Sequence, residues 1–158
     1  MGFHLPGVSG ESPLLPILIT DDDDGHAFLV EDNLRRGGVD TTYLRFNDGQ
    51  ELLDFLAGRT TEPEFKKDGS YLLLLDICMP KVDGVTALQQ IKANPELRKL
   101  PVIMLTTTED PREVDRCHAL GCNIYIHKPV SYDAFADAIT HLGKFVSLVQ
   151  VPRLSRSA

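Results

Sequence analysis

The sequence lacks the long apolar runs and clustered basic residues that mark membrane-spanning and nucleic-acid-binding proteins. No apolar run approaches the roughly 20 residues needed to cross a bilayer. Residues 1–16 combine neither a basic start nor a sustained apolar stretch, so we expect no secretory signal there. Basic residues form at most pairs, such as Arg35-Arg36, and 23 acidic residues outnumber 16 basic ones, giving a formal net charge of −7. Because phosphate groups are bound by clustered lysine and arginine, we expect neither a nucleic acid nor a membrane as partner.

Cysteine is scarce as well. Cys78, Cys117 and Cys122 are an odd number, and no C-x-x-C spacing occurs. A disulfide framework and a zinc site are therefore not expected. Reduced thiols favour a cytoplasmic location.

What the sequence does contain is enough material for one folded domain: 158 residues, of which 42% are apolar. Short apolar runs alternate with helical patterns, which predicts strands at 17–20, 43–46, 72–75, 102–105 and 124–126, and helices at 26–36, 50–56, 85–93, 113–120 and 132–149. Such alternation is typical of an α/β fold, a doubly wound parallel sheet with helices on both faces. We expect a flexible N-terminal segment at 1–15, one domain at 16–151 with an extended C-terminal helix, and a tail at 152–158.

Polar residues follow four of the predicted strands at their carboxyl ends, where ligands bind in open parallel sheets. Four aspartates, Asp21 to Asp24, follow the first strand, Asp76 the third, Thr106 the fourth and Lys128 the fifth. Clustered carboxylates are the ligands that Mg²⁺ prefers where phosphoryl groups are bound. With a lysine and a threonine hydroxyl nearby, these are the groups that phosphoryl transfer needs, and Asp76 could be a nucleophile that forms an acyl phosphate.

Each of these residues alone has a simpler interpretation. A run of aspartates is usually a solvated loop or the start of a helix. Asp76 could merely end a strand, Thr106 could be an ordinary strand residue, Lys128 a surface residue and Cys78 a small buried hydrophobe. Only their joint occurrence at four strand ends favours a functional site.

The spacing of these residues resembles that of the receiver domains of two-component response regulators. The resemblance covers residues 16–142 and depends on Asp76 with Met79-Pro80 and Asp83-Gly84, on Thr106 after residues 101–105, and on Lys128-Pro129. It implies a flavodoxin-like fold with strand order 2-1-3-4-5.

The resemblance also implies a role for each site residue. Asp76 would accept a phosphoryl group from a sensor histidine kinase, and Mg²⁺ would be bound by Asp21, Asp22, Asp76 and the backbone carbonyl of Cys78. Thr106 and Lys128 would contact the phosphoryl group, and Tyr125 would be the switch aromatic. The peptide bond between Lys128 and Pro129 would be cis. Asp23 and Asp24 leave the position of the acidic pair open by one residue, and the distance to Gly38 favours Asp21-Asp22.

Two segments resemble more narrowly the single-domain regulators paired with bacterial phytochromes. They are residues 20–39, with Gly25-His26-Ala27, and residues 145–152. This implies a bacteriophytochrome as kinase and a homodimer through Phe145 to Val151; the alternative is that this segment folds back over its own domain. Since only 30 residues follow Lys128, we expect output through the surface of the last two helices and the fifth strand or through a dimer.

Two other functions stay open. A haloacid-dehalogenase-type phosphatase would use Asp22-Asp23-Asp24-Gly25 with Thr106 and Lys128, although His26 stands where that motif has threonine. A receiver that is not phosphorylated could act as a binding module. If the chain is a regulator, we expect it to be no enzyme in the ordinary sense but a phosphoacceptor that catalyses its own phosphorylation and dephosphorylation. We expect the dephosphorylation to be slow, because Cys78 and Thr108 are poorly suited to position an attacking water molecule.

Overall fold

The computed structural model describes residues 15–66, 68–107, 109–148 and 154. Its five strands are β1 (Ile17–Thr20), β2 (Tyr43–Phe46), β3 (Leu72–Asp76), β4 (Val102–Thr106) and β5 (Ile124–His127). All neighbouring strands are parallel, and their order is β2-β1-β3-β4-β5. The predicted fold class and strand order are confirmed.

Five helices connect and follow the strands: α1 (Asp24–Arg36), α2 (Gly49–Leu56), α3 (Gly84–Ala93), α4 (Pro111–Leu120) and α5 (Tyr132–Val146). The first four begin one or two residues before the predicted starts. In each of them an aspartate just before the helix accepts a hydrogen bond from a backbone N–H of the first turn. The capping aspartate, and not the first apolar residue, therefore sets where each of these helices begins.

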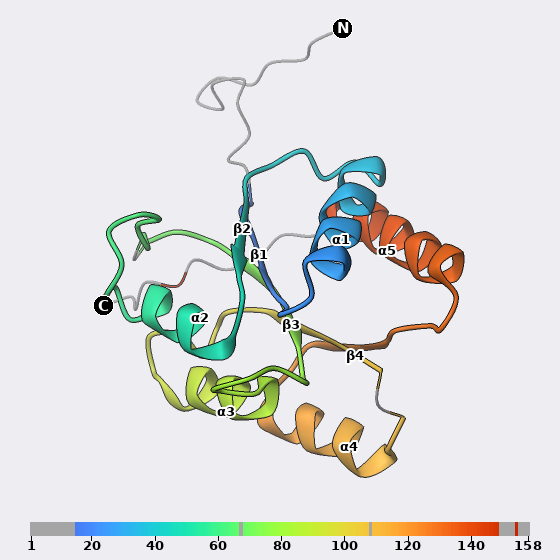
Figure 1. Ribbon diagram of the computed structural model, residues 1–158. Coiled ribbons are helices and arrows are strands. Elements are labelled where there is room, and N and C mark those ends of the chain that lie inside the picture. Colours follow the sequence, from blue (N-terminus) through green and yellow to red (C-terminus); the bar gives the residue numbers. More distant parts are fainter. Residues whose placement is uncertain (1–14, 67, 108, 149–153, 155–158) are drawn as a thin grey trace, which may run out of the picture.

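In Figure 1, α1 and α5 lie side by side on one face of the sheet, and α2, α3 and α4 cover the other face. Alternate residues of the central strands belong to the two cores that these layers form with the sheet. Toward α2–α4 point Leu18, Leu73, Leu75, Val102 and Met104. Toward α1 and α5 point Ile17, Ile19, Leu72, Leu74, Ile103 and Leu105. Burial on both faces explains why the central strands are continuous apolar runs.

The C-terminal helix is shorter than predicted. It ends at Val146, and Ser147 caps it, so residues 147 and 148 are not helical; Val149 lies outside the described residues. Val146 is buried against the α1–α5 core, which leaves Phe145 and Leu148 exposed. Leu154, in the segment expected to be a tail, is only 3% exposed, and its backbone N–H donates to the carbonyl of Gly69 at 3.0 Å.

None of the helices in the part of the chain that the structure describes has the length and hydropathy needed to span a membrane. The three cysteines are free thiols, as expected.

Candidate functional site

Three carboxylates meet at the carboxyl edge of the sheet. Asp21, Asp22 and Asp76 each offer an oxygen atom, and these atoms all lie within 4.8 Å of one another. Asp21 is 3% exposed and directly follows β1, while Asp22 is exposed. Asp76, the last residue of β3, is 9% exposed. Strands β1 and β3 are hydrogen-bonded neighbours, so their ends bring together carboxylates that are far apart in the sequence.

The other two aspartates of the run are engaged elsewhere. The Oδ1 of Asp23 accepts a hydrogen bond from the backbone N–H of His26 at 3.0 Å and so caps α1. Asp24 pairs with the Nη1 of Arg45 at 2.6 Å, and Nε and Nη2 of Arg45 donate to the backbone carbonyl of Asp21 at 3.2 and 2.7 Å. The acidic pair that faces Asp76 is therefore Asp21-Asp22, which the spacing to Gly38 had favoured.

Lys128 supplies the positive charge of the site. Its side chain is 4% exposed, and Nζ lies 3.0 Å from Oδ2 of Asp21 and 3.7 Å from Oδ2 of Asp76. Its backbone N–H donates to the carbonyl of Thr106 at 2.7 Å, which fixes the end of β5 against the end of β4. The buried ammonium thus balances part of the negative charge of the carboxylate cluster.

The prediction of a cis peptide bond between Lys128 and Pro129 is wrong, because this bond is trans in the structure. Among the described residues, the cis peptide bond joins Glu62 and Pro63. The trans form is favoured at an X–Pro bond by about 0.5–1 kcal/mol. Here Nζ of Lys128 reaches both carboxylates without the cis form, so the geometry gives no reason for the less stable isomer.

Burial raises the pKa of Asp76 to about 6. The ammonium of Lys128 opposes this rise, the carboxylates of Asp21 and Asp22 add to it, and a hydrogen bond from the backbone N–H of Cys78 again opposes it. The ionised form of Asp76 therefore lies in surroundings that do not fully stabilise it. A divalent cation between the three carboxylates would correct this imbalance.

Cys78 is exposed, so the interpretation of a small buried hydrophobe is wrong. Partial desolvation, and then the nearby Asp76 carboxylate, raise the pKa of its thiol. This shift favours the protonated form of the thiol.

Thr106 and Tyr125 occupy the edge of the site nearest α4. Thr106 is fully buried at the end of β4. The ring of Tyr125 packs against the core beneath α4, and its hydroxyl is buried without a hydrogen-bond partner. Burial is the main reason that the pKa of Tyr125 is raised to about 12. Thr108 lies outside the described residues.

Two residues with contacts in the site were not singled out as site residues from the sequence. Arg45 holds the loop of aspartates, and His26 places Nδ1 3.4 Å from Nζ of Lys128. A lone charged residue in the short strand 43–46 was a signal for Arg45. For His26, a signal was its place one turn after the acidic pair.

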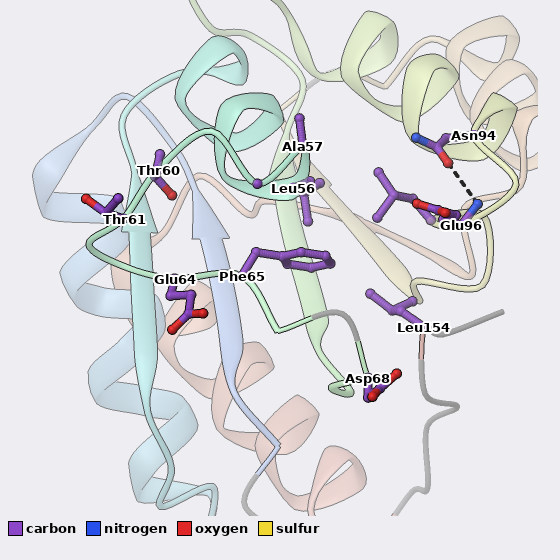
Figure 2. A pocket seen from close by; sticks show the side chains of 12 residues that line it. Leu56, Ala57, Thr60, Thr61, Glu64, Phe65, Asp68, Asn94, Glu96 and Leu154 are labelled. Atoms are coloured by element: carbon purple, nitrogen blue, oxygen red, sulfur yellow. Dashed lines mark hydrogen bonds between the residues drawn. The ribbon is translucent and has the colours of Figure 1, made fainter. Parts of the chain in front are cut away.

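A cavity of about 770 Å³ lies elsewhere, between the loop after α2 and the turn after α3 (Figure 2). Thr60, Thr61, Glu64 and Phe65, from the loop after α2, line one side, and the turn after α3 and Leu154 line the other. No residue of the carboxylate cluster borders it. The cavity and the carboxylate cluster are thus two separate features.

Comparison with known proteins gives a consistent result. A model of the response regulator receiver domain matches residues 17–140. The response regulator Rcp1 of Synechocystis sp. is 32% identical over 122 residues, which cover 77% of this chain and 82% of Rcp1.

Solved structures agree. A response regulator receiver domain from Rhodospirillum rubrum is 42% identical, with a TM-score of 0.83 over 90% of this chain and 100% of that one. The Mn²⁺-bound form of Rcp1 is 27% identical, with a TM-score of 0.78 over 87% and 99% of the two chains. The bacteriophytochrome response regulator AtBRR is 33% identical, with a TM-score of 0.64 over 87% and 98%.

Proposed function

The chain belongs to the response regulator receiver domain family, and from this membership we propose that Asp76 is the residue that accepts the phosphoryl group. The chain is a response regulator, related to Rcp1 and to bacteriophytochrome response regulators. The observation that carries the proposal is the position of Asp76: it ends β3, within reach of two further carboxylates and of the Lys128 ammonium.

In the proposed transfer, a carboxylate oxygen of Asp76 forms a bond to phosphorus while the bond from phosphorus to the imidazole nitrogen of a phosphohistidine breaks. The imidazole leaves with the bonding electron pair and takes up a proton. Lys128 stabilises the negative charge on the phosphoryl oxygens. Asp76 must be ionised to attack, and the Lys128 ammonium favours this form by opposing the burial that raises the pKa of Asp76.

The donor set fits a hard divalent cation, since Asp21, Asp22 and Asp76 offer only oxygen atoms. The backbone carbonyl of Cys78 would complete the set of protein ligands. The Mn²⁺-bound structure of Rcp1 supports a divalent metal in this family. We take the resident ion to be Mg²⁺, which lowers the charge repulsion between the phosphoryl group and the carboxylates.

We further propose that Thr106 and Tyr125 transmit the change. A phosphoryl group on Asp76 offers new acceptors for the Thr106 hydroxyl, and movement of Thr106 leaves space into which Tyr125 can repack. Output would then pass through the surface of α4, β5 and α5. Tyr125 supports this role because its hydroxyl has no partner in the present conformation.

The proposed donor is a phytochrome-type histidine kinase, by analogy with AtBRR. Because such kinases draw on cytosolic ATP, the protein would act in the cytoplasm.

We propose that the receiver unit covers residues 16–151 and forms a homodimer through exposed Phe145 and Leu148 at the end of α5. Light scattering at tens of micromolar should then show a dimer, and a monomer would contradict this assembly.

The alternative phosphatase needs Asp24 in the reaction centre, and the structure disfavours it because Arg45 holds Asp24 at 2.6 Å. The deciding experiment is incubation with Mg²⁺ and acetyl phosphate. We expect one phosphoryl group per chain, stable in acid and labile in alkali, and absent from Asp76→Asn. The exposed helix residue Asp115 provides a matched control, and Asp115→Asn should be labelled like the wild type.

Multiple turnover of acetyl phosphate without a stable label would support a phosphatase instead. Absence of any label would support an unphosphorylated binding module. The label should also decay slowly after acetyl phosphate is removed, and loss within seconds would contradict the expected slow dephosphorylation.

A further inference from the structure

We propose that His26 is a positioning residue that holds the ammonium group of Lys128 throughout the phosphorylation cycle. This inference rests on the proposed function of the site. His26 is the second residue after the Asp24 that begins α1, and it is outside the carboxylate cluster. Its Nδ1 lies 3.4 Å from Nζ of Lys128.

A lysine ammonium has three N–H donors, and burying it is costly where hydrogen-bond partners are lost. Lys128 is 4% exposed. Around its Nζ the structure places Oδ2 of Asp21 at 3.0 Å and Nδ1 of His26 at 3.4 Å, both within hydrogen-bond distance, and Oδ2 of Asp76 at 3.7 Å, which forms an ion pair but no hydrogen bond. Without His26, Asp21 would be the one group of these three within hydrogen-bond distance of the ammonium.

The three groups around Nζ of Lys128 differ in whether they take part in the proposed reaction. Asp21 and Asp76 belong to the carboxylate cluster that we propose binds the metal, and Asp76 also receives the phosphoryl group. Both carboxylates therefore change partners as metal and phosphoryl group bind. His26 does neither, so its contact with Lys128 is the one that can persist while the ammonium turns toward the phosphoryl oxygens.

The backbone of His26 and its ring are each held by one contact, and Oδ2 of Asp23 lies 4.0 Å from Nδ1. Asp23 accepts a hydrogen bond from the backbone N–H of His26 at 3.0 Å, which fixes the first turn of α1. The ring packs edge-on against Phe135 of α5, with centroids 5.9 Å apart and an interplanar angle of 81°. Phe135 is 4% exposed and is itself immobilised in the α1–α5 core. For Nδ1 to accept from Lys128, the neutral ring must carry its proton on Nε2.

The role can be tested by comparing His26→Leu with His26→Asn in the full chain, because the asparagine carbonyl can supply an acceptor near the position of Nδ1. We expect His26→Leu to be phosphorylated by saturating acetyl phosphate about three- to tenfold more slowly, the effect of one lost hydrogen bond. His26→Asn should be within about twofold of the wild type. The affinity for Mn²⁺, measured by electron paramagnetic resonance, should be unchanged in both.

His141 is a matched control, since it lies exposed on α5 and its Nδ1 contacts the carbonyl of Asp137 in its own helix. His141→Leu should change neither quantity. The inference is overturned if His26→Leu reacts at the wild-type rate, if His26→Asn is as slow as His26→Leu, or if Mn²⁺ affinity falls in parallel with the rate. If the wild type itself takes up no phosphoryl group, the proposed function fails, which is a different result.

Discussion

The two sides of the carboxylate cluster are built differently. On one side α1 and α5 lie against each other so closely that a Cβ atom at Gly37 would overlap the carbonyl oxygen of Thr140. A hydrogen bond of 3.2 Å from Oγ1 of Thr140 to Oδ1 of buried Asn33 joins the two helices. The amide nitrogen of Asn33 also donates to the carbonyl of Leu29 at 2.9 Å, so both ends of this buried side chain have partners.

On the other side α4 buries only Cys117, and Tyr125 of β5 leaves its hydroxyl buried without a partner. The acidic pair and His26 are attached to the tightly packed side, whereas Lys128, Thr106 and Tyr125 belong to the β4–α4–β5 side. This difference in packing indicates that the two sides have different roles. The α1–α5 side fixes the position of Asp21 and Asp22, and we expect the α4–β5 side to move at lower cost.

The largest effect should come from crowding the α1–α5 side. Gly37→Val places a side chain where the backbone of α5 already lies, and we expect a loss of about 3 kcal/mol in the free energy of unfolding. Ala119→Val, on the exposed face of α4, should change it by no more than about 0.5 kcal/mol. Urea denaturation measures both, and equal losses would remove the distinction between the two sides.

Asp76 lies between the two sides, and its effect on stability should depend on pH. Its native pKa of about 6 exceeds the value of about 3.9 in an unfolded chain, so the native state binds the proton more tightly. The resulting penalty is absent below about pH 4, grows as pH rises through about 6 and is complete above that.

Asp76→Asn removes this penalty. Without divalent cations, we expect the variant to be about 1–2 kcal/mol more stable than the wild type at pH 7.5, which is less than the full pKa shift would give because solvent screens the charge. This gain in stability should vanish toward pH 4. Thermal melts across this range measure it. Adding Mg²⁺ should stabilise the wild type more than the variant. A variant that is less stable at pH 7.5, or a gain that does not change with pH, would contradict the account.

A smaller effect with opposite signs is expected for two tyrosines. Tyr43, on β2 next to α1, donates its hydroxyl to the carbonyl of Val39, whereas the hydroxyl of Tyr125 is buried and unpaired. Tyr43→Phe should lose about 1 kcal/mol and Tyr125→Phe should gain about as much in urea denaturation. If both variants lose stability, the hydroxyl of Tyr125 has a stabilising partner, which would contradict the proposed difference between the two sides.

The sequence predicted those features that depend on local pattern. Periodicity located each strand to within a residue, because the strands are short apolar runs bounded by polar residues. Family motifs indicated Asp76, Lys128 and the acidic pair, because these residues stand at strand ends whose order the fold determines.

Features that depend on contacts between distant residues were not predicted. The roles of Arg45 and His26 follow from side chains that cross between elements, and no local pattern encodes such contacts. The end of α5 was placed too late because the apolar pattern of the sequence continues beyond Val146, where the helix ends. Leu154, further along the chain, is buried in the core on the α2–α4 side, which the sequence pattern did not indicate. The trans isomer at Lys128-Pro129 could not be predicted from the dipeptide, because the two isomers of an X–Pro bond differ by only about 0.5–1 kcal/mol.

The most direct test of the account is a crystal structure of the protein grown with Mg²⁺ and beryllofluoride. We expect the metal among Asp21, Asp22 and Asp76, beryllofluoride on the Asp76 carboxylate, and Lys128 in contact with a fluoride. Displacement should be confined to the α4–β5 side, with α1 and α5 unchanged. A structure in which the carboxylate cluster is empty, or in which both groups bind elsewhere, would contradict the assignment of the site.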